Sequence, residues 1–181
     1  MTALARITCT AIVWAALGIS ITLVPDVASA QPASTGCTST QGANNTQTLR
    51  CRGDVIIVAE DGAKFTLQSH NRSGDVDAVN LQSKALLVDA PRQKAKQRFQ
   101  VITPQAIAAV RGTKWAVDVQ ETRTSVLVLT GRVAVRRPSG GRQVQLGPGE
   151  GVDVDRGSTE PLTVKRWGQP RVDALMARLG Q

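Results

Sequence analysis

The sequence is poor in the residue types that most enzymes and metalloproteins use. Its 181 residues include three cysteines, one histidine and no tyrosine, and aromatic residues make up only 3% of the chain. So few His and Cys side chains exclude most transition-metal sites built from protein ligands alone. The nucleophile pattern G-x-S-x-G is also absent. We therefore expect no metal, no cofactor, no catalytic residue and no enzymatic activity.

Acidic residues are fewer than basic ones, 14 against 22, which gives a formal net charge of +8. Asp153 and Asp155 lie two residues apart, close to Glu150. Paired carboxylates can serve glycoside hydrolysis or calcium binding, but no further ligand cluster accompanies them, so we expect a polar strand face. His70 lies in turn-like sequence beside Asn71, without an evident partner, and we expect it at the surface.

Long hydrophobic runs are absent except near the N-terminus. Arg6 precedes an uncharged, mostly apolar stretch over residues 7–24, Pro25 ends it, and Ala28-Ser29-Ala30 follows with small residues at both ends. This order predicts a secretory signal peptide over residues 1–30, cleaved near Ala30. The mature protein would then be periplasmic or secreted. The alternative is an uncleaved membrane anchor.

Cysteine is scarce in the mature chain, where only Cys37 and Cys51 remain. Two thiols in an oxidising compartment predict a disulfide. Closing so short a loop stabilises a fold by ~3 kcal/mol in the chain-entropy model. We expect the bridge to hold a polar N-terminal segment over residues 31–53. A redox-active pair is the alternative, although the C-x-x-C spacing is missing.

Two-residue alternation of apolar and polar side chains is what the mature chain has in abundance. Phe99 and Val101 alternate with polar neighbours, whereas residues 126–129 are apolar throughout, as in a central buried strand. Glycine-rich turns separate such runs over residues 54–165. The pattern predicts an all-β sandwich, roll or solenoid-like sheet of about ten to twelve short strands.

Two local patterns within this region are specific enough to test. Residues 60–62, Glu-Asp-Gly, follow a β-branched run and predict a hairpin turn, since Asp-Gly adopts positive φ readily. Leu162 and Val164 alternate with polar residues near the end of the region and predict a last short strand.

Only the C-terminal residues 166–181 predict a helix. Pro170 suits a first helical position, Gly180 suits a C-cap, and the apolar residues between them fall on one face. We expect this helix to close an open face of the sheet. The alternative is a docking helix for an acidic partner surface, flanked by basic residues, namely Lys165, Arg166, Arg171 and Arg178.

A stripe of cations precedes the alternating segment at Phe99. If the chain is extended there, its four basic side chains project to one side: Arg92, Lys94, Lys96 and Arg98. Such a stripe attracts anionic polymers, in an envelope an acidic glycan or lipid. A solvated hairpin tip is the simpler interpretation. We do not expect nucleic acid, because no recognition motif or aromatic stacking set accompanies the charge.

The most distinctive stretch places Arg111-Gly112-Thr113 between two apolar segments. Gly112 permits positive φ or a close backbone approach, and Thr113 can hydrogen-bond to local backbone. Arg111 could tie a turn or a nearby carboxylate such as Asp118. These properties predict a structural corner.

This corner also belongs to a longer motif string. The segments concerned are residues 99–104, 111–113, 117–119, 124–126, 130–135 and 146–152. Together they resemble the FecR-type periplasmic domain over about residues 54–155. The resemblance implies an all-β, extracytoplasmic domain without catalytic residues.

Members of the family are best known as transmembrane regulators, in which a cytoplasmic anti-sigma segment precedes a membrane helix. Their periplasmic domain senses an outer-membrane transporter. This sequence has no such segment before its apolar run, so we expect a compact secreted member. Its expected partner is an envelope protein, either a membrane signalling protein or an outer-membrane transporter, and its alternative ligand is an anionic envelope glycan or lipid.

Overall fold

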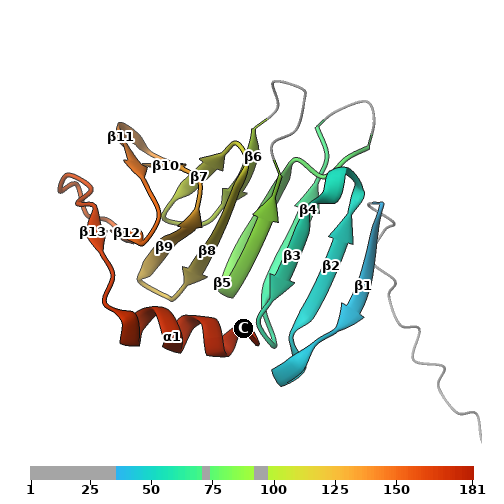
Figure 1. The fold of residues 1–181 in the computed structure, drawn as a ribbon. Helices are drawn as coiled ribbons and strands as arrows, with labels where there is room; N and C mark the ends of the chain where they lie inside the picture. The colour runs from blue at the N-terminus through green and yellow to red at the C-terminus, as the bar shows by residue number, and fades with distance from the viewer. Residues whose placement is uncertain (1–35, 71–73, 92–97) are drawn as a thin grey trace, which may run out of the picture. The chain divides into compact units, whose positions relative to one another are not determined.

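Strands dominate the computed structural model, which describes residues 36–70, 74–91 and 98–181 (Figure 1). These residues all belong to one structural unit, residues 32–181. They form a single curled sheet of thirteen strands: β1 (Cys37–Gln41), β2 (Gln47–Cys51), β3 (Ile56–Ala59), β4 (Lys64–Gln68), β5 (Ala78–Ala90), β6 (Phe99–Ile102), β7 (Ile107–Val110), β8 (Thr113–Val119), β9 (Arg123–Thr130), β10 (Val133–Arg137), β11 (Gly140–Leu146), β12 (Glu150–Asp155) and β13 (Lys165–Arg166). Two 3₁₀ turns, η1 (Ala43–Asn45) and η2 (Arg52–Asp54), and one helix, α1 (Gln169–Arg178), complete it. The predicted all-β fold with one C-terminal helix is confirmed.

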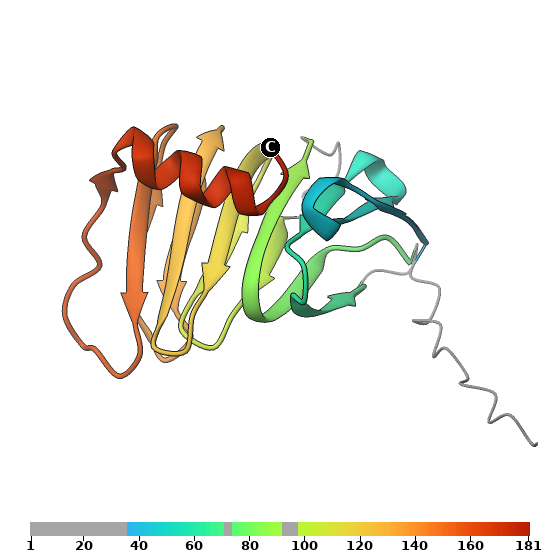
Figure 2. The same cartoon turned by 90° about the horizontal axis from the view of Figure 1, so that it is seen from below.

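Strand β5 divides the sheet into two layers. Its first half pairs with β4 and β6, whereas its second half pairs with β3 and β8. The covered layer consists of β1, β2, β3, the second half of β5, β8, β9, β12 and β13. The open layer consists of β4, the first half of β5, β6, β7, β10 and β11. Figure 2 shows β5, in green, as a long curved strand.

The two halves of β5 meet at Lys84, whose backbone is left-handed with φ of 69°. Val79 and Leu81 belong to the main core before it, and Leu86 and Val88 belong to the same core after it. The core positions therefore change from odd to even numbers at Lys84. One inserted residue produces this shift and also bends a strand, so a single strand lines the same core in both layers.

Side chains from both layers fill this core. Trp115 of the covered layer is fully buried and meets Phe99 of the open layer edge to face, with ring centroids 5.9 Å apart. Val126 and Val128 of β9 are also fully buried. Leu127, between them, is buried in a second cluster on the opposite face of the layer. β9 is thus the central strand that its apolar run predicts.

Helix α1 packs on this second face of the covered layer. Pro170 lies in its first turn, and Gly180 follows the C-cap residue Leu179 with φ of 68°. Leu175 and Leu179 are buried against apolar strand residues, which are Val58, Ala85, Leu87, Ala116 and Leu127. The prediction that the helix closes an open face of the sheet is confirmed.

A forked ion pair fixes the C-terminal end of α1. Arg178 donates to both carboxylate oxygens of Glu60, at 3.0 and 2.6 Å, and to both of Asp118, at 3.0 and 2.9 Å. The hydrogen bonds that Arg178 donates to Asp118 and to Glu60 raise the pKa of its guanidinium above the usual range. Glu60 also accepts the Ala85 amide at 2.9 Å. One side chain therefore ties α1 to β8 and to the turn after β3.

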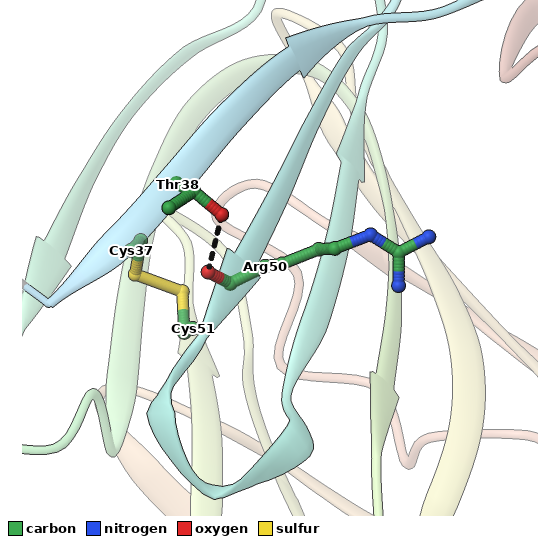
Figure 3. Close-up of a disulfide and its surroundings, with 4 residues drawn as sticks. All are labelled: Cys37, Thr38, Arg50 and Cys51. Atoms are coloured by element: carbon green, nitrogen blue, oxygen red, sulfur yellow. Dashed lines mark hydrogen bonds between the residues drawn. A yellow bond between two sulfur atoms is a disulfide. The ribbon is translucent and has the colours of Figure 1, made fainter.

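The polar N-terminal segment forms a hairpin rather than a loose leader. Cys37 and Cys51 face each other in the β1–β2 register and are joined by a disulfide (Figure 3). Beside them, the Thr38 hydroxyl donates to the Arg50 carbonyl at 3.4 Å. The predicted disulfide is confirmed. β2 continues the sheet by pairing with β3, which leaves β1 as an edge strand.

Two local predictions were wrong. The turn at residues 60–62 forms, with the Ala63 amide donating to the Glu60 carbonyl at 3.0 Å, but β3 and β4 pair with different halves of β5 and not with each other. A turn signal specifies a chain reversal; it does not specify the strands' partners. Leu162 and Val164 lie outside any strand and pack against the main core, so their alternation reflects packing of an extended segment without ladder hydrogen bonds.

Removing the Arg178 fork should destabilise the protein. Arg178→Ala leaves the Glu60 and Asp118 side chains, which are only 12% and 9% exposed, without their counter-charge. Because Arg178 is itself partly solvated, we expect the free energy of unfolding in urea to fall by about 2 kcal/mol. The control Arg142→Ala, on the exposed edge of β11, should change it by less than about 0.5 kcal/mol. Equal effects of the two variants would contradict the anchoring role.

Removing the disulfide should release the edge strand. We expect the double variant C37S/C51S to lose ~3 kcal/mol of unfolding free energy, the chain-entropy value for this loop length. Amide hydrogen exchange should accelerate in β1 and stay slow in β9. Reduction of the unmodified protein serves as the control and should reproduce both changes. Unaltered exchange in β1 would show that the strand pairing suffices without the bridge.

Candidate functional site

The open layer presents a row of small and polar side chains on its outer face. Gln100, Ala109, Ala134 and Gln145 are direct register partners across β6, β7, β10 and β11. All four are partly or fully exposed, while most of their neighbours along each strand are buried. Because side chains alternate between the two faces of each strand, the residues between the core positions point outward, and Ala109 and Ala134 lie opposite each other in the middle of this outer face.

Three arginines lie at one end of this row. Arg98 immediately precedes β6, Arg111 immediately follows β7 and Arg132 immediately precedes β10. The strand residues adjacent to them are register partners of one another, so the arginines occupy neighbouring positions at the same end of three strands. All three are exposed, and within the described ranges no hydrogen bond or ion pair involves their guanidinium groups.

These arginines border a groove of about 630 Å³. Ala109 and Ala134 lie in it, and Gln143 and Gln145 of β11 line its other side. Among its described lining residues there is no Asp or Glu. We call this site, with Arg98, Arg111 and Arg132 at its border, the arginine groove. Its chemistry is that of an anion-binding surface with amide groups alongside.

A close backbone contact positions two of the three arginines. Gly112 has φ of 70° and Gly131 has φ of 84°. A Cβ atom at Gly131 would lie 2.6 Å from the Gly112 carbonyl oxygen and 2.8 Å from the Thr113 hydroxyl. The buried Thr113 hydroxyl donates to the Arg132 carbonyl at 3.1 Å. The predicted corner therefore exists, but Thr113 bonds to the backbone of a second corner rather than to its own.

The predicted site residues divide between this groove and other places. Arg98 and Arg111 line the groove. Arg92, Lys94 and Lys96 lie outside the described residues. Arg111 does not reach Asp118, whose carboxylate is held by Arg178, so that part of the prediction was wrong. Asp118 belongs to the covered layer, whereas Arg111 follows a strand of the open layer and lines the groove on its outer face.

Arg132 is the groove residue that sequence reasoning missed. A signal for it exists in the strand alternation. Arg132 lies two residues before the outward-facing Ala134, so the alternation places both on the same face. Arg111 is related in the same way to Ala109, and Arg98 to Gln100. Pairing β7 with β10 brings these positions together, and that pairing is long-range information that a single sequence does not contain.

The carboxylates near Glu150 have structural partners. Asp153 accepts from the Ser125 hydroxyl at 2.6 Å and from Arg171 at 2.5 and 3.0 Å. Burial alone would raise the pKa of Asp153, but these hydrogen bonds and the positive charge of Arg171 outweigh it and lower that pKa below its usual value. Asp155 accepts from Arg123 at 2.6 Å. The expected polar strand face is what the structure contains.

Two further expectations concern Glu150 and His70. Glu150 accepts the Gly147 amide at 2.7 Å and closes the turn before β12. His70 is exposed as expected, but it has a partner: its Nδ1 lies 2.8 Å from a carboxylate oxygen of Asp77. The turn between β4 and β5 brings the two side chains together.

The described part of the chain contains no group of three or more His, Cys, Asp or Glu side chains arranged to hold a metal ion. It also contains no helix with the length and apolar character needed to span a membrane.

Comparisons with known proteins agree with this fold. A family model described as FecR protein matches residues 39–134, just over half of the chain. No curated protein matches the sequence. Two crystal structures of a "putative anti-sigma factor" from Parabacteroides distasonis ATCC 8503, at 1.65 and 2.50 Å resolution, align with a TM-score of 0.59 and 19% identity over 77% of this chain. The chain spans 64% of that protein's length, and the likeness concerns the fold.

The contact between the two corners yields a stability test. Gly131→Ala should destabilise the protein by well over 1 kcal/mol, because positive φ strains alanine and its Cβ would overlap the Gly112 carbonyl. Gly140→Ala is the matched control: Gly140 also has positive φ, 96°, but nothing lies within 4 Å of its Cβ position. We expect thermal denaturation to show a clearly larger fall in Tm for Gly131→Ala. Equal falls would mean that conformational strain alone, and no close contact, explains the glycine.

Proposed function

Because the chain belongs to the FecR family, we propose that it is a non-enzymatic extracytoplasmic domain that binds a protein partner in cell-envelope signalling or sensing. The family and the fold connect it to signalling. The observation that carries the binding role is the contrast between its two outer faces. Helix α1 buries one of them, while the other presents the arginine groove, bordered by cations that no described side chain neutralises.

Location outside the cytoplasm rests on two features. Residues 1–30 carry the sequence order of a signal peptide, which we propose is cleaved near Ala30. The Cys37–Cys51 disulfide suits an oxidising compartment. In such a compartment the partner would be a membrane signalling protein or an outer-membrane transporter. The solved relative is described as an anti-sigma factor, and this chain's partner would belong to the same kind of pathway.

Helix α1 is not the surface that we propose for docking. Arg171 and Arg178, which a docking helix would offer to an acidic partner, are bound to Asp153 and to Glu60 and Asp118 of the same chain. Arg171 also stacks over Trp167 at 3.5 Å. These contacts make the helix part of the domain, so deletion of residues 169–181 would affect folding before it affected binding.

The groove also supports a second candidate function, the binding of an anionic envelope glycan or lipid. The sequence suggested Arg92, Lys94, Lys96 and Arg98 for that role. Arg98 lines the groove beside two other arginines, which gives this alternative a described contact. The two proposed functions predict different ligands in the cell envelope: a protein partner for the first, and a glycan or lipid for the second.

Chemical crosslinking in the native envelope, followed by mass spectrometry, tests the proposed function. We expect reproducible recovery of a membrane signalling protein or an outer-membrane transporter on the mature protein. Gly131→Ala, which displaces the groove corner, should reduce the yield, whereas Gly140→Ala, which strains only a turn of β11, should leave it unchanged. Recovery of glycan or lipid alone would favour the alternative function, and recovery of neither would contradict both.

A further inference from the structure

We infer that the arginine groove binds an extended acidic segment of the partner protein, a conclusion that deepens the proposed function and rests on it. The first argument is charge. Arg98, Arg111 and Arg132 come from three separate segments and converge on one groove whose described lining contains no acidic residue. Asp77 is the acidic residue near Arg98, but its carboxylate is paired with His70 and lies outside the groove. Guanidinium groups are weakly hydrated and form paired hydrogen bonds with carboxylates, so Asp and Glu side chains match this border.

The second argument is that these arginines differ from the three that form ion pairs within the fold. Arg123, Arg171 and Arg178 each donate to a carboxylate of their own chain. Their positive charge is neutralised within the molecule, whereas that of the groove arginines is not. A partner carboxylate could therefore bind these guanidinium groups without first breaking an ion pair within the protein.

The third argument concerns shape. The floor is made by Ala109 and Ala134, which face each other across β7 and β10, and their short side chains let a polypeptide backbone approach the sheet. β11 lies at the edge of the open layer and pairs only with β10 among the described strands. Edge strands accept an added strand, and the Gln143 and Gln145 amides can donate to and accept from peptide groups.

The same lining argues against a sugar or a lipid as the occupant. No aromatic side chain lines the groove, although stacking on aromatic rings is the usual way to hold a ring-shaped ligand face. The apolar lining consists of two alanine methyl groups, Pro148 and Val110, which is itself buried, and this is too little apolar surface to hold acyl chains. An acidic peptide uses every feature present: the cations, the flat floor and the amides.

A direct binding measurement tests this inference. The probe is a fluorescein-labelled decapeptide that alternates Asp and Thr, titrated with the mature protein at low salt and followed by fluorescence anisotropy. We expect saturable binding that weakens steeply as salt is added. The double variant R111E/R132E should bind at least tenfold more weakly, since it replaces two attractive charges by repulsive ones. The corresponding Lys-Thr peptide should not bind.

The matched control is R50E, which changes a charge on the covered layer. Arg50 is exposed on β2, and its side chain projects away from the disulfide (Figure 3). It should alter the affinity less than twofold. R50E changes the net charge by two and R111E/R132E changes it by four, so a loss of binding free energy in R50E that is half or more of the loss in the double variant would show that net charge alone attracts the peptide and would overturn the inference. So would stronger competition by phosphatidylglycerol vesicles or dextran sulfate than by unlabelled peptide.

The outcome can be separated from that of the proposed function by repeating the envelope crosslinking with R111E/R132E. Thermal denaturation of both variants checks that they fold, which we expect because the replaced side chains form no described hydrogen bond or ion pair. Capture of the same partner at full yield would refute the groove as its site and leave the proposed function standing. Peptide binding that needs both arginines, without any captured protein, would support the groove and refute the proposed function.

Discussion

One constraint organises the molecule: strand β5 has to serve two layers with one set of core-facing side chains. With the apolar residues of this sequence, a strand that kept its alternation through the bend would turn Leu86 and Val88 away from the core. Lys84 solves this by adopting a left-handed conformation, after which Leu86 and Val88 take over the role of Val79 and Leu81. The two layers therefore share one core, and the outer face of the covered layer remains free to receive the helix.

The two outer faces then differ in how their charges are used. On the covered side, arginines of the C-terminal helix are bound by carboxylates of the turn after β3, β8 and β12, so charge there contributes to holding the domain together. On the open side, strand alternation places short and amide side chains on the surface and leaves three arginines at the strand ends. Because the arginines of the covered side are already paired within the chain, we propose the open side as the surface for recognition.

Local chemistry explains which parts of this arrangement the sequence predicts. Alternation predicts β6, the continuous apolar run at residues 126–129 predicts β9, and Pro170 and Gly180 predict the ends of α1, because strand faces and helix ends depend on near neighbours. The pairing of β3 and β4 with opposite halves of β5 depends on contacts far apart in the chain, and a local turn signal at residues 60–62 could not reveal it. The same limit applied to the groove: Arg98 and Arg111 were noted separately, but only the β7–β10 pairing adds Arg132 and makes them one site.

The disulfide has a mechanical consequence. Cys37 is the first residue of the edge strand β1, and its bond leads directly to the last residue of β2. Both strands of this hairpin lie inside the loop that the bond closes. A pull on the chain ahead of Cys37 is therefore transmitted through the two sulfur atoms to Cys51 and onward to residue 52. The backbone of β1 and β2 lies outside the loaded path, so the edge hairpin is shielded from extension.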